Sequence, residues 1–276
     1  RVRDLFTAKV GGTVVNSADS IVISAFMGLT ALAMYNNYYY IMNSVIMFVY
    51  MIFTAIGAGV GHSLVTASLD KNYKDFNTLT FIVSWICGFC ISCFYSLYQP
   101  FMKIWVGEKL MFNNIVVMMF CAYFYLYIVC GIFSTYKDSA GIWHEDRYRP
   151  LIGAVVNLAL NVMFVKTYGV YAILMSTIIS YLIINIPWLI YNVFHLLFKV
   201  NPLKYLGRLF VYTCVSLVAC YITSLCTRLI LIEGLVGLIL KLVVCIVISN
   251  LVMLICYFKN NELTNCIGIV KRIIKR

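Results

Sequence analysis

Eight apolar runs of about twenty residues each follow one another along the chain, and they constrain its fold more than any other feature. A run of this length crosses the hydrocarbon core of a bilayer as a helix, whereas the strands of a membrane barrel alternate over about ten residues. Hydrophobic residues make up 63% of the chain and charged residues only 11%, and a soluble domain of this size cannot bury so much apolar surface. The sequence therefore excludes soluble enzymes, nucleic-acid-binding modules and disordered tails. It predicts an all-α, polytopic membrane protein with about eight transmembrane helices.

The connections between the runs are short. A turn within residues 27–37 separates the first two spans, because the uninterrupted run is too long for one helix. Residues 99–108 are expected to form an interfacial loop, in which Pro100 breaks the helix and Trp105 lies at the membrane–water boundary. The expected spans are residues 7–28, 36–59, 78–99, 113–136, 150–167, 170–197, 207–227 and 235–258.

Positive charge alternates between the connecting segments. Sixteen of the 21 Lys and Arg residues lie in the two terminal segments and in every second loop, and four lie in the remaining loops. The positive-inside rule then places both termini in the cytoplasm, and it also accounts for the net charge of +11. The basic tail, residues 259–276, fits either an amphipathic helix on anionic lipid or an ordinary positive-inside anchor, and we favour the anchor.

No catalytic motif is present: the sequence contains no nucleophile elbow, no zinc-protease motif and no phosphate-binding loop. Cys87, Cys90 and Cys93 recur every third residue, but a metal site needs a second thiol cluster, so these cysteines are expected to pack as small apolar residues. Adjacent residues such as His144–Asp146 rarely chelate a metal. We therefore expect no enzymatic activity, no metal site and no cofactor.

Polar residues inside the apolar runs are the informative positions, because they are costly in lipid and usually face a bundle interior or a water-filled cavity. Asn16 and Asp19 share one face of the first span, and Lys9 lies about 80° away, so the three border one cavity. Asn157 and Asn161 are four residues apart, and either line this cavity or hydrogen-bond between helices. Of these groups, Asp19 is the hardest to explain by a purely structural role.

The second span adds a tyrosine-rich polar stretch. Asn36 and Asn43 lie beside Tyr35 and Tyr38–Tyr40, in a stretch that fits either a cavity wall or an interfacial aromatic belt. Lys241 lies near the outer end of the last span, where its side chain is expected to reach the membrane surface.

Five segments, in chain order, carry a resemblance to a known family. They are residues 8–24 (AKVGGTVVNSADSIVIS), 28–38 (GLTALAMYNNY), 57–63 (GAGVGHS), 141–150 (GIWHEDRYRP) and 157–172 (NLALN followed by the turn YGVYA). Together they resemble the second half of polysaccharide flippases, the O-antigen, capsule and teichuronic-acid exporters of the MATE-like MOP superfamily. The chain departs from the family pattern at Asn36, where Ser is usual, and at Tyr171 and Ala172.

The resemblance covers about residues 5–200 and implies a specific fold. Members of the family have twelve to fourteen helices in two pseudo-symmetric lobes. Residues 1–200 are then the second lobe, and residues 201–276 are two extra transmembrane helices with a basic cytoplasmic tail. Because the first residue is Arg1, we expect a C-terminal fragment that lacks the first lobe.

The resemblance also implies a function. We expect a transporter of the bacterial plasma membrane that exports polyprenyl diphosphate-linked oligosaccharides for the synthesis of O-antigen, capsule or lipopolysaccharide. Its expected partners are this lipid-linked glycan, membrane lipid, a coupling cation (H⁺ or Na⁺) and the glycan polymerase machinery, with no nucleic acid. Lys9, Arg147 and Arg149 are expected to attract the diphosphate, and the Asn and Tyr side chains to contact sugar hydroxyls. Asp19 either binds the coupling cation or holds Lys9. The expected cavity-lining residues are Lys9, Asn16, Asp19, Asn36, Asn43, Arg147, Arg149, Asn157 and Asn161.

Two other functions remain as alternatives. A cation-coupled multidrug exporter of the same superfamily needs an acidic cavity, and Asp19 is the only carboxylate inside the predicted spans. A membrane glycan polymerase or ligase generally carries a large external loop, and every predicted external loop here is short. Both observations favour the flippase.

Overall fold

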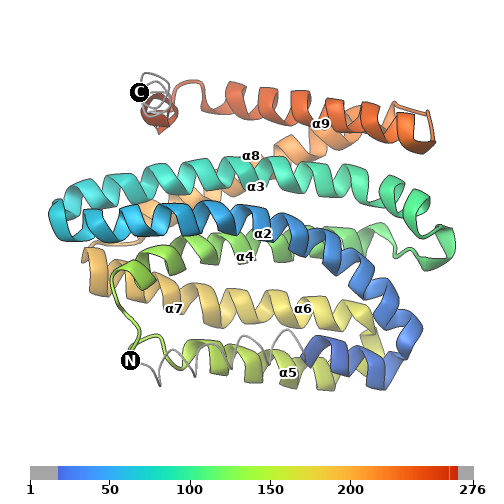
Figure 1. Cartoon of the computed structure of the whole chain (residues 1–276), viewed down its shortest axis with the longest axis horizontal. Coiled ribbons are helices and arrows are strands. Elements are labelled where there is room, and N and C mark those ends of the chain that lie inside the picture. The colour runs from blue at the N-terminus through green and yellow to red at the C-terminus, as the bar shows by residue number, and fades with distance from the viewer. Residues whose placement is uncertain (1–17, 261, 267–276) are drawn as a thin grey trace. The chain divides into compact units, whose positions relative to one another are not determined.

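The computed structural model describes residues 18–260 and 262–266 of the chain (Figure 1). Helices make up 88% of the structure, and no strand occurs within these two ranges. Seven of the described helices are long and apolar enough to cross a membrane, and a shorter apolar helix, Ala18–Met27, precedes them. The prediction of an all-α, polytopic membrane protein is confirmed. The protein is therefore a multi-pass membrane protein.

The seven apolar helices follow one another with short connections (Figure 1). The fifth is a continuous rod, Val170–Phe198, in which α-helical and π-helical segments alternate. Its segments are α6 (Val170–Ser180), η2 (Tyr181–Asn185), α7 (Ile186–Ile190) and η3 (Tyr191–Phe198). The other six apolar helices are α2 (Leu29–Thr66), α3 (Leu69–Trp105), α4 (Asn114–Ser139), α5 (Arg149–Tyr168), α8 (Leu203–Arg228) and α9 (Gly234–Tyr257). A single 3₁₀ turn, η1 (Glu108–Leu110), lies between α3 and α4, and residues 262–266 form a short helix.

The first two helices are separated by one residue. Gly28 has a φ of 86°, a conformation that glycine adopts without strain, and α2 begins at Leu29. The predicted turn over residues 27–37 is therefore too long, because one glycine with a positive φ is enough to break the helix. Met27 ends the preceding helix, and residues 29–37 of that predicted turn belong to the first turns of α2.

The predicted loop at Pro100 is wrong. Helix α3 continues through Pro100 to Trp105 and ends before Gly107, which has a φ of 80°. Tyr98 and Met102 are both buried, so the helix packs tightly on each side of the proline. Their burial offsets the single backbone hydrogen bond that a proline removes, as is common in transmembrane helices.

The chain forms two compact units. Unit 1 contains Ala18–Met27, α2, α4, α5 and the rod, and unit 2 contains α3, η1, α8 and α9. One boundary between the units falls between Asn201 and Pro202, but residues 68–111, which lie inside the predicted domain 1–200, belong to unit 2. The assignment of these parts to a transporter lobe and two extra helices stays a prediction.

Unit 2 has an aromatic core where its three long helices meet. Phe81 of α3, Tyr212 of α8 and Tyr257 of α9 contact one another edge-to-face, and Met253 is buried among them. At Gly88, a Cβ atom would lie 2.8 Å from Ser216 Oγ, so α3 needs a glycine there to approach α8 this closely.

Candidate functional site

One row of residues along α5 faces the interior of unit 1. Arg149, Gly153, Asn157 and Asn161 recur every fourth residue and therefore lie on one side of the helix. Asn157 and Asn161 are 1% and 0% exposed, whereas Val155, on the opposite side of α5, is 60% exposed. In a membrane protein the apolar side contacts lipid, so the polar row belongs to the protein interior.

At the deep end of this row, five side chains form a hydrogen-bonded group that we call the Asp19 cluster: Asp19, Tyr35, Asn157, Asn161 and Thr177. Asn161 Nδ2 donates to Asp19 Oδ1 at 2.7 Å and to Asn157 Oδ1 at 3.2 Å. Asn157 Nδ2 donates to Thr177 Oγ1 at 3.0 Å, and the Tyr35 hydroxyl donates to Asp19 Oδ2 at 3.4 Å. The cluster therefore links Ala18–Met27, α2, α5 and α6.

The Asp19 carboxylate is buried among neutral partners. It is 6% exposed, and no lysine or arginine within residues 18–260 and 262–266 forms an ion pair with it. A buried charge is normally compensated by an opposite charge or a bound ion. Asn161 Oδ1 lies in the same cluster, is buried, and has no hydrogen-bond partner among the described groups. Carboxylate, amide and hydroxyl oxygens are the donors that hard cations prefer, so the cluster can hold a proton or a small monovalent cation.

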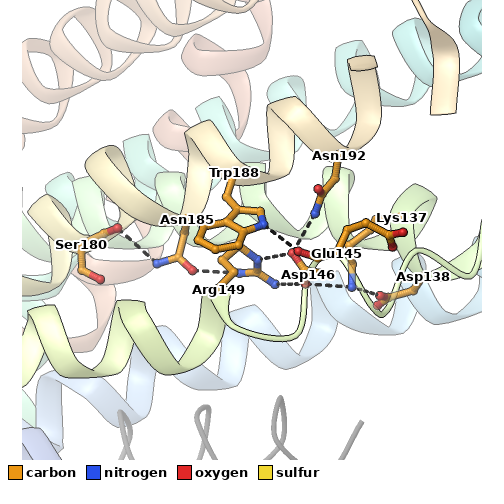
Figure 2. A network of polar contacts seen from close by, with 9 residues as sticks. All are labelled: Lys137, Asp138, Glu145, Asp146, Arg149, Ser180, Asn185, Trp188 and Asn192. Atoms are coloured by element: carbon orange, nitrogen blue, oxygen red, sulfur yellow. Dashed lines mark hydrogen bonds and ion pairs between the residues drawn. The ribbon is translucent and has the colours of Figure 1, made fainter. Parts of the chain in front are cut away.

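At the opposite end of the row lies an ion network centred on Asp146 (Figure 2). The Asp146 carboxylate is 3% exposed and accepts from Arg149 Nε at 2.7 Å and from Arg149 Nη2 at 2.9 Å. Lys137 Nζ lies 3.0 Å from Asp146 Oδ2, and Asn192 Nδ2 donates to Asp146 Oδ1 at 3.0 Å. Arg149 also donates through Nη1 to Asn185 Oδ1 at 2.8 Å. The network joins α4, the loop before α5, α5 itself and the rod.

The charges of this network balance. Buried Lys137 pairs with Asp138 as well as with Asp146, and its ammonium lies 4.3 Å from the centre of the Trp143 ring. Two cations, Lys137 and Arg149, therefore face two carboxylates, Asp138 and Asp146. The Arg149 guanidinium is engaged by groups of the protein itself, and its predicted contact with a diphosphate stays a prediction.

The π-helical segment η2 brings two polar residues of the rod to the same wall. Ser180 Oγ donates to the carbonyl of Gly153 at 2.9 Å, and Asn185 accepts from Arg149. Residues five apart point about 140° away from each other in an α-helix. In a π-helix, which bonds i to i+5, they come closer to one face, and Asn185 Nδ2 donates to the Ser180 carbonyl at 3.2 Å.

The remaining predicted cavity residues lie elsewhere. Asn36 is exposed and Asn43 half-buried, and both lie beside the buried stripe of α2 rather than in it. Arg147 lies in the loop before α5, 3.0 Å from His144 Nδ1 through its Nη1 atom. Lys9 and Asn16 lie outside the described residues, as does most of the basic tail. The structure thus brings together Asp19, Asn157 and Asn161, with Arg149 at the far end of the same row.

The sequence reasoning missed several residues of this interior. Thr177, Ser180 and Asn185 are single polar residues in an apolar run, and the criterion that selected Asn157 would also have found them. Lys137 and Asp146 gave no such signal, because charged residues next to a loop are ordinarily exposed.

Comparisons with protein-family models, with curated proteins and with solved structures give no match for this chain. Fold and site define a multi-pass helical membrane protein whose first unit has a polar, partly charged interior.

Proposed function

We propose that the protein is a cation-coupled transporter of the bacterial plasma membrane that exports polyprenyl diphosphate-linked oligosaccharides for surface polysaccharide synthesis. The observation that carries the transport proposal is the Asp19 carboxylate, which is buried in an apolar helix among neutral partners. Ionisable groups inside membrane helices are costly, and they typically mark ion or substrate pathways. The glycan substrate is supported by the resemblance of residues 8–172 to polysaccharide flippases.

The proposed substrate needs a polar passage. A diphosphate and a sugar chain do not cross hydrocarbon unaided, because their polar groups would lose all hydrogen bonds to water. In this proposal the glycan passes along the side of α2 that carries Asn36 and Asn43, whose amides contact the sugar hydroxyls while the polyprenyl tail stays in lipid. Lys9 and Arg147 attract the diphosphate, and the polymerase machinery receives the exported glycan on the outer side.

Cation binding supplies the driving force. A monovalent cation at Asp19 neutralises the buried carboxylate, so the loaded and empty forms of the cluster differ in charge. A ligand shifts a conformational equilibrium only by its difference in affinity between two states. Because Asp19 connects Ala18–Met27 to α2 and α5, a change at this carboxylate alters the packing of three helices.

Proteoliposomes that contain a fluorescent lipid-linked oligosaccharide test the proposal. We expect export to rise at least tenfold when a Na⁺ or H⁺ gradient is imposed, and this response to be lost in Asp19→Asn. Asp70→Asn removes an exposed carboxylate at the start of α3 and serves as the matched control with a normal response. The proposal fails if the wild-type protein exports no glycan, or if Asp19→Asn still responds to both gradients.

The same proteoliposomes discriminate against the multidrug exporter. That alternative predicts gradient-driven export of a fluorescent organic cation and none of the lipid-linked glycan. The glycan exporter predicts the opposite pattern, with Asp19→Asn losing glycan export.

A further inference from the structure

A cavity of about 220 Å³ lies inside unit 1, between the Asp19 cluster and the Asp146 network. It follows α5 from Arg149 to Asn157, eight residues that span about 12 Å along a helix. Its walls come from α2, α4, α5 and the rod. The cavity is therefore elongated and runs parallel to the helices.

The walls of the cavity carry several polar groups without unpaired charge. Hydroxyls of Tyr50, Tyr127, Ser134 and Ser180 line it together with the amide of Asn185. Such groups hydrogen-bond water, and the cavity has room for several waters at about 30 Å³ each in the liquid. An apolar cavity stays dry, whereas a polar one of this size holds water.

The two ends of the cavity differ. At the Arg149 end, Ser134, Arg149 and Pro150 are partly exposed, and at the other end Asn157 and Thr177 are buried. Asn157 and Thr177 belong both to the cavity wall and to the Asp19 cluster, and Asn161 and Asp19 lie directly behind them. One hydrogen-bonded layer separates the cavity from the carboxylate.

The mouth of the cavity does not repel cations. Among the described residues, Arg149 is the only charged one that lines the cavity, and Asp146 neutralises it through two hydrogen bonds. Asp19 lies behind the last layer of the cavity, and no lysine or arginine of the described residues pairs with its negative charge. The electrostatic gradient along the cavity thus draws a cation from the mouth towards the cluster.

We propose that this cavity is the hydrated path along which the coupling cation reaches Asp19, from the membrane side that carries the 140–148 loop. The inference rests on the proposed function only in that it assumes a cation at Asp19. It adds the direction of access, the walls of the path and the layer, Asn157 with Thr177, that the cation crosses last.

Neighbouring residues of α5 provide a matched pair of probes. Ala154 lines the cavity and is buried, whereas Val155 is 60% exposed on the opposite side of the helix. In a protein with all native cysteines replaced, we expect Ala154→Cys to react with a small, charged, membrane-impermeant thiol reagent. Val155→Cys should not react, because a thiol in lipid is neither hydrated nor ionised. Ser134→Cys on α4 is a second probe of the path, in case Ala154→Cys accumulates poorly.

Sidedness and cation protection complete the test. The reagent should label Ala154→Cys only from the side on which exposed Glu145→Cys is labelled. Na⁺ or low pH should slow this labelling at least threefold relative to choline at neutral pH, and Asp19→Asn should abolish the slowing. Protection by Na⁺ would identify Na⁺ as the cation that uses the path, and protection by low pH would identify H⁺.

Three results overturn the path: no labelling of either probe, labelling equal to that of Val155→Cys, or labelling that neither cation slows. These outcomes are distinct from failure of the proposed function. If the cavity is not labelled in a protein that shows gradient-driven glycan export, only the proposed path is refuted. If the cavity is labelled and cations slow the labelling, but the protein exports no glycan, only the proposed glycan substrate is refuted.

Discussion

The interiors of the two units are built on different principles. In unit 1 several buried polar side chains bond to side chains of other helices, as Asn161 does to Asp19 and Asn157 does to Thr177. In unit 2 many buried hydroxyls bond to a carbonyl one turn earlier in their own helix, as Ser92 does to Gly88 and Ser249 does to Cys245. The first pattern makes the position of each helix depend on its neighbours, whereas bonds between helices are fewer in the described part of unit 2, as between Thr80 and Tyr205.

Charge shows the same contrast. Among the described residues, the buried charged side chains Asp19, Lys137 and Asp146 all belong to unit 1, and the buried polar side chains of unit 2 are neutral. Unit 2 is held by aromatic packing around Phe81, which tolerates small changes in polarity. Ionisable groups in a membrane interior mark function, so the comparison assigns the working part to unit 1 and a packing role to unit 2.

The largest expected effect is that of Asp146→Ala. It leaves buried Lys137 and partly buried Arg149 without their shared carboxylate, and removing one partner of a buried ion pair costs about 3–5 kcal/mol. We expect the variant to accumulate poorly in membranes and to unfold at a clearly lower temperature in detergent. In unit 2, Ser92→Ala removes a buried hydroxyl that donates to the Gly88 carbonyl of its own helix, and it should accumulate normally. Equal stability of the two variants would break the comparison.

Asn161→Ala tests the deep end of the same interior. It removes the two hydrogen bonds to Asp19 and Asn157 and leaves the carboxylate less satisfied, at a cost of about 1–3 kcal/mol. We expect a moderate loss of thermal stability together with loss of the response of export to the cation gradient. Ser249→Ala in unit 2 is the control, since its hydroxyl bonds only to the Cys245 carbonyl. A variant that loses stability but keeps the gradient response would make Asn161 a purely structural residue.

The sequence predicted the helices of both units but only part of the contrast between them. The sequence pointed to Asp19, Asn157 and Asn161, because polar residues inside an apolar run are costly in lipid and usually face the protein interior. The network around Asp146 was not found, because its partners Lys137, Arg149 and Asn192 come from three separate helical segments that only the folded chain brings together. The loop predicted at Pro100 was wrong for a related reason. The burial of Tyr98 and Met102, which depends on tertiary packing, outweighs the local preference of proline to break a helix.

Two glycines allow a comparison between the cavity wall of unit 1 and a close helix contact in unit 2. A Cβ at Gly153 would lie 3.1 Å from Asn185 Nδ2, in the wall of the cavity. A Cβ at Gly88 would lie 2.8 Å from Ser216 Oγ and 3.0 Å from Met253 Sδ, in the close contact of α3 with α8 and α9. We expect Gly153→Val to slow thiol labelling of Ala154→Cys and to weaken the gradient response. Gly88→Val should destabilise the protein by about 1–3 kcal/mol through overpacking and leave the cation dependence of the remaining export unchanged.

The smallest effect is expected at an exposed ion pair of unit 2. Lys103 Nζ lies 3.1 Å from Glu108 Oε1 and 3.2 Å from Glu233 Oε1, and all three side chains are exposed. Exposed ion pairs contribute little to stability, because water and salt screen them and holding two long side chains in one geometry costs entropy. Glu233→Gln should therefore leave accumulation, unfolding temperature and gradient-driven export within experimental error of the wild type, at low and at high salt. A clear loss of export in this variant would place a working charge in unit 2, and the division between a working and a packing unit would have to be abandoned.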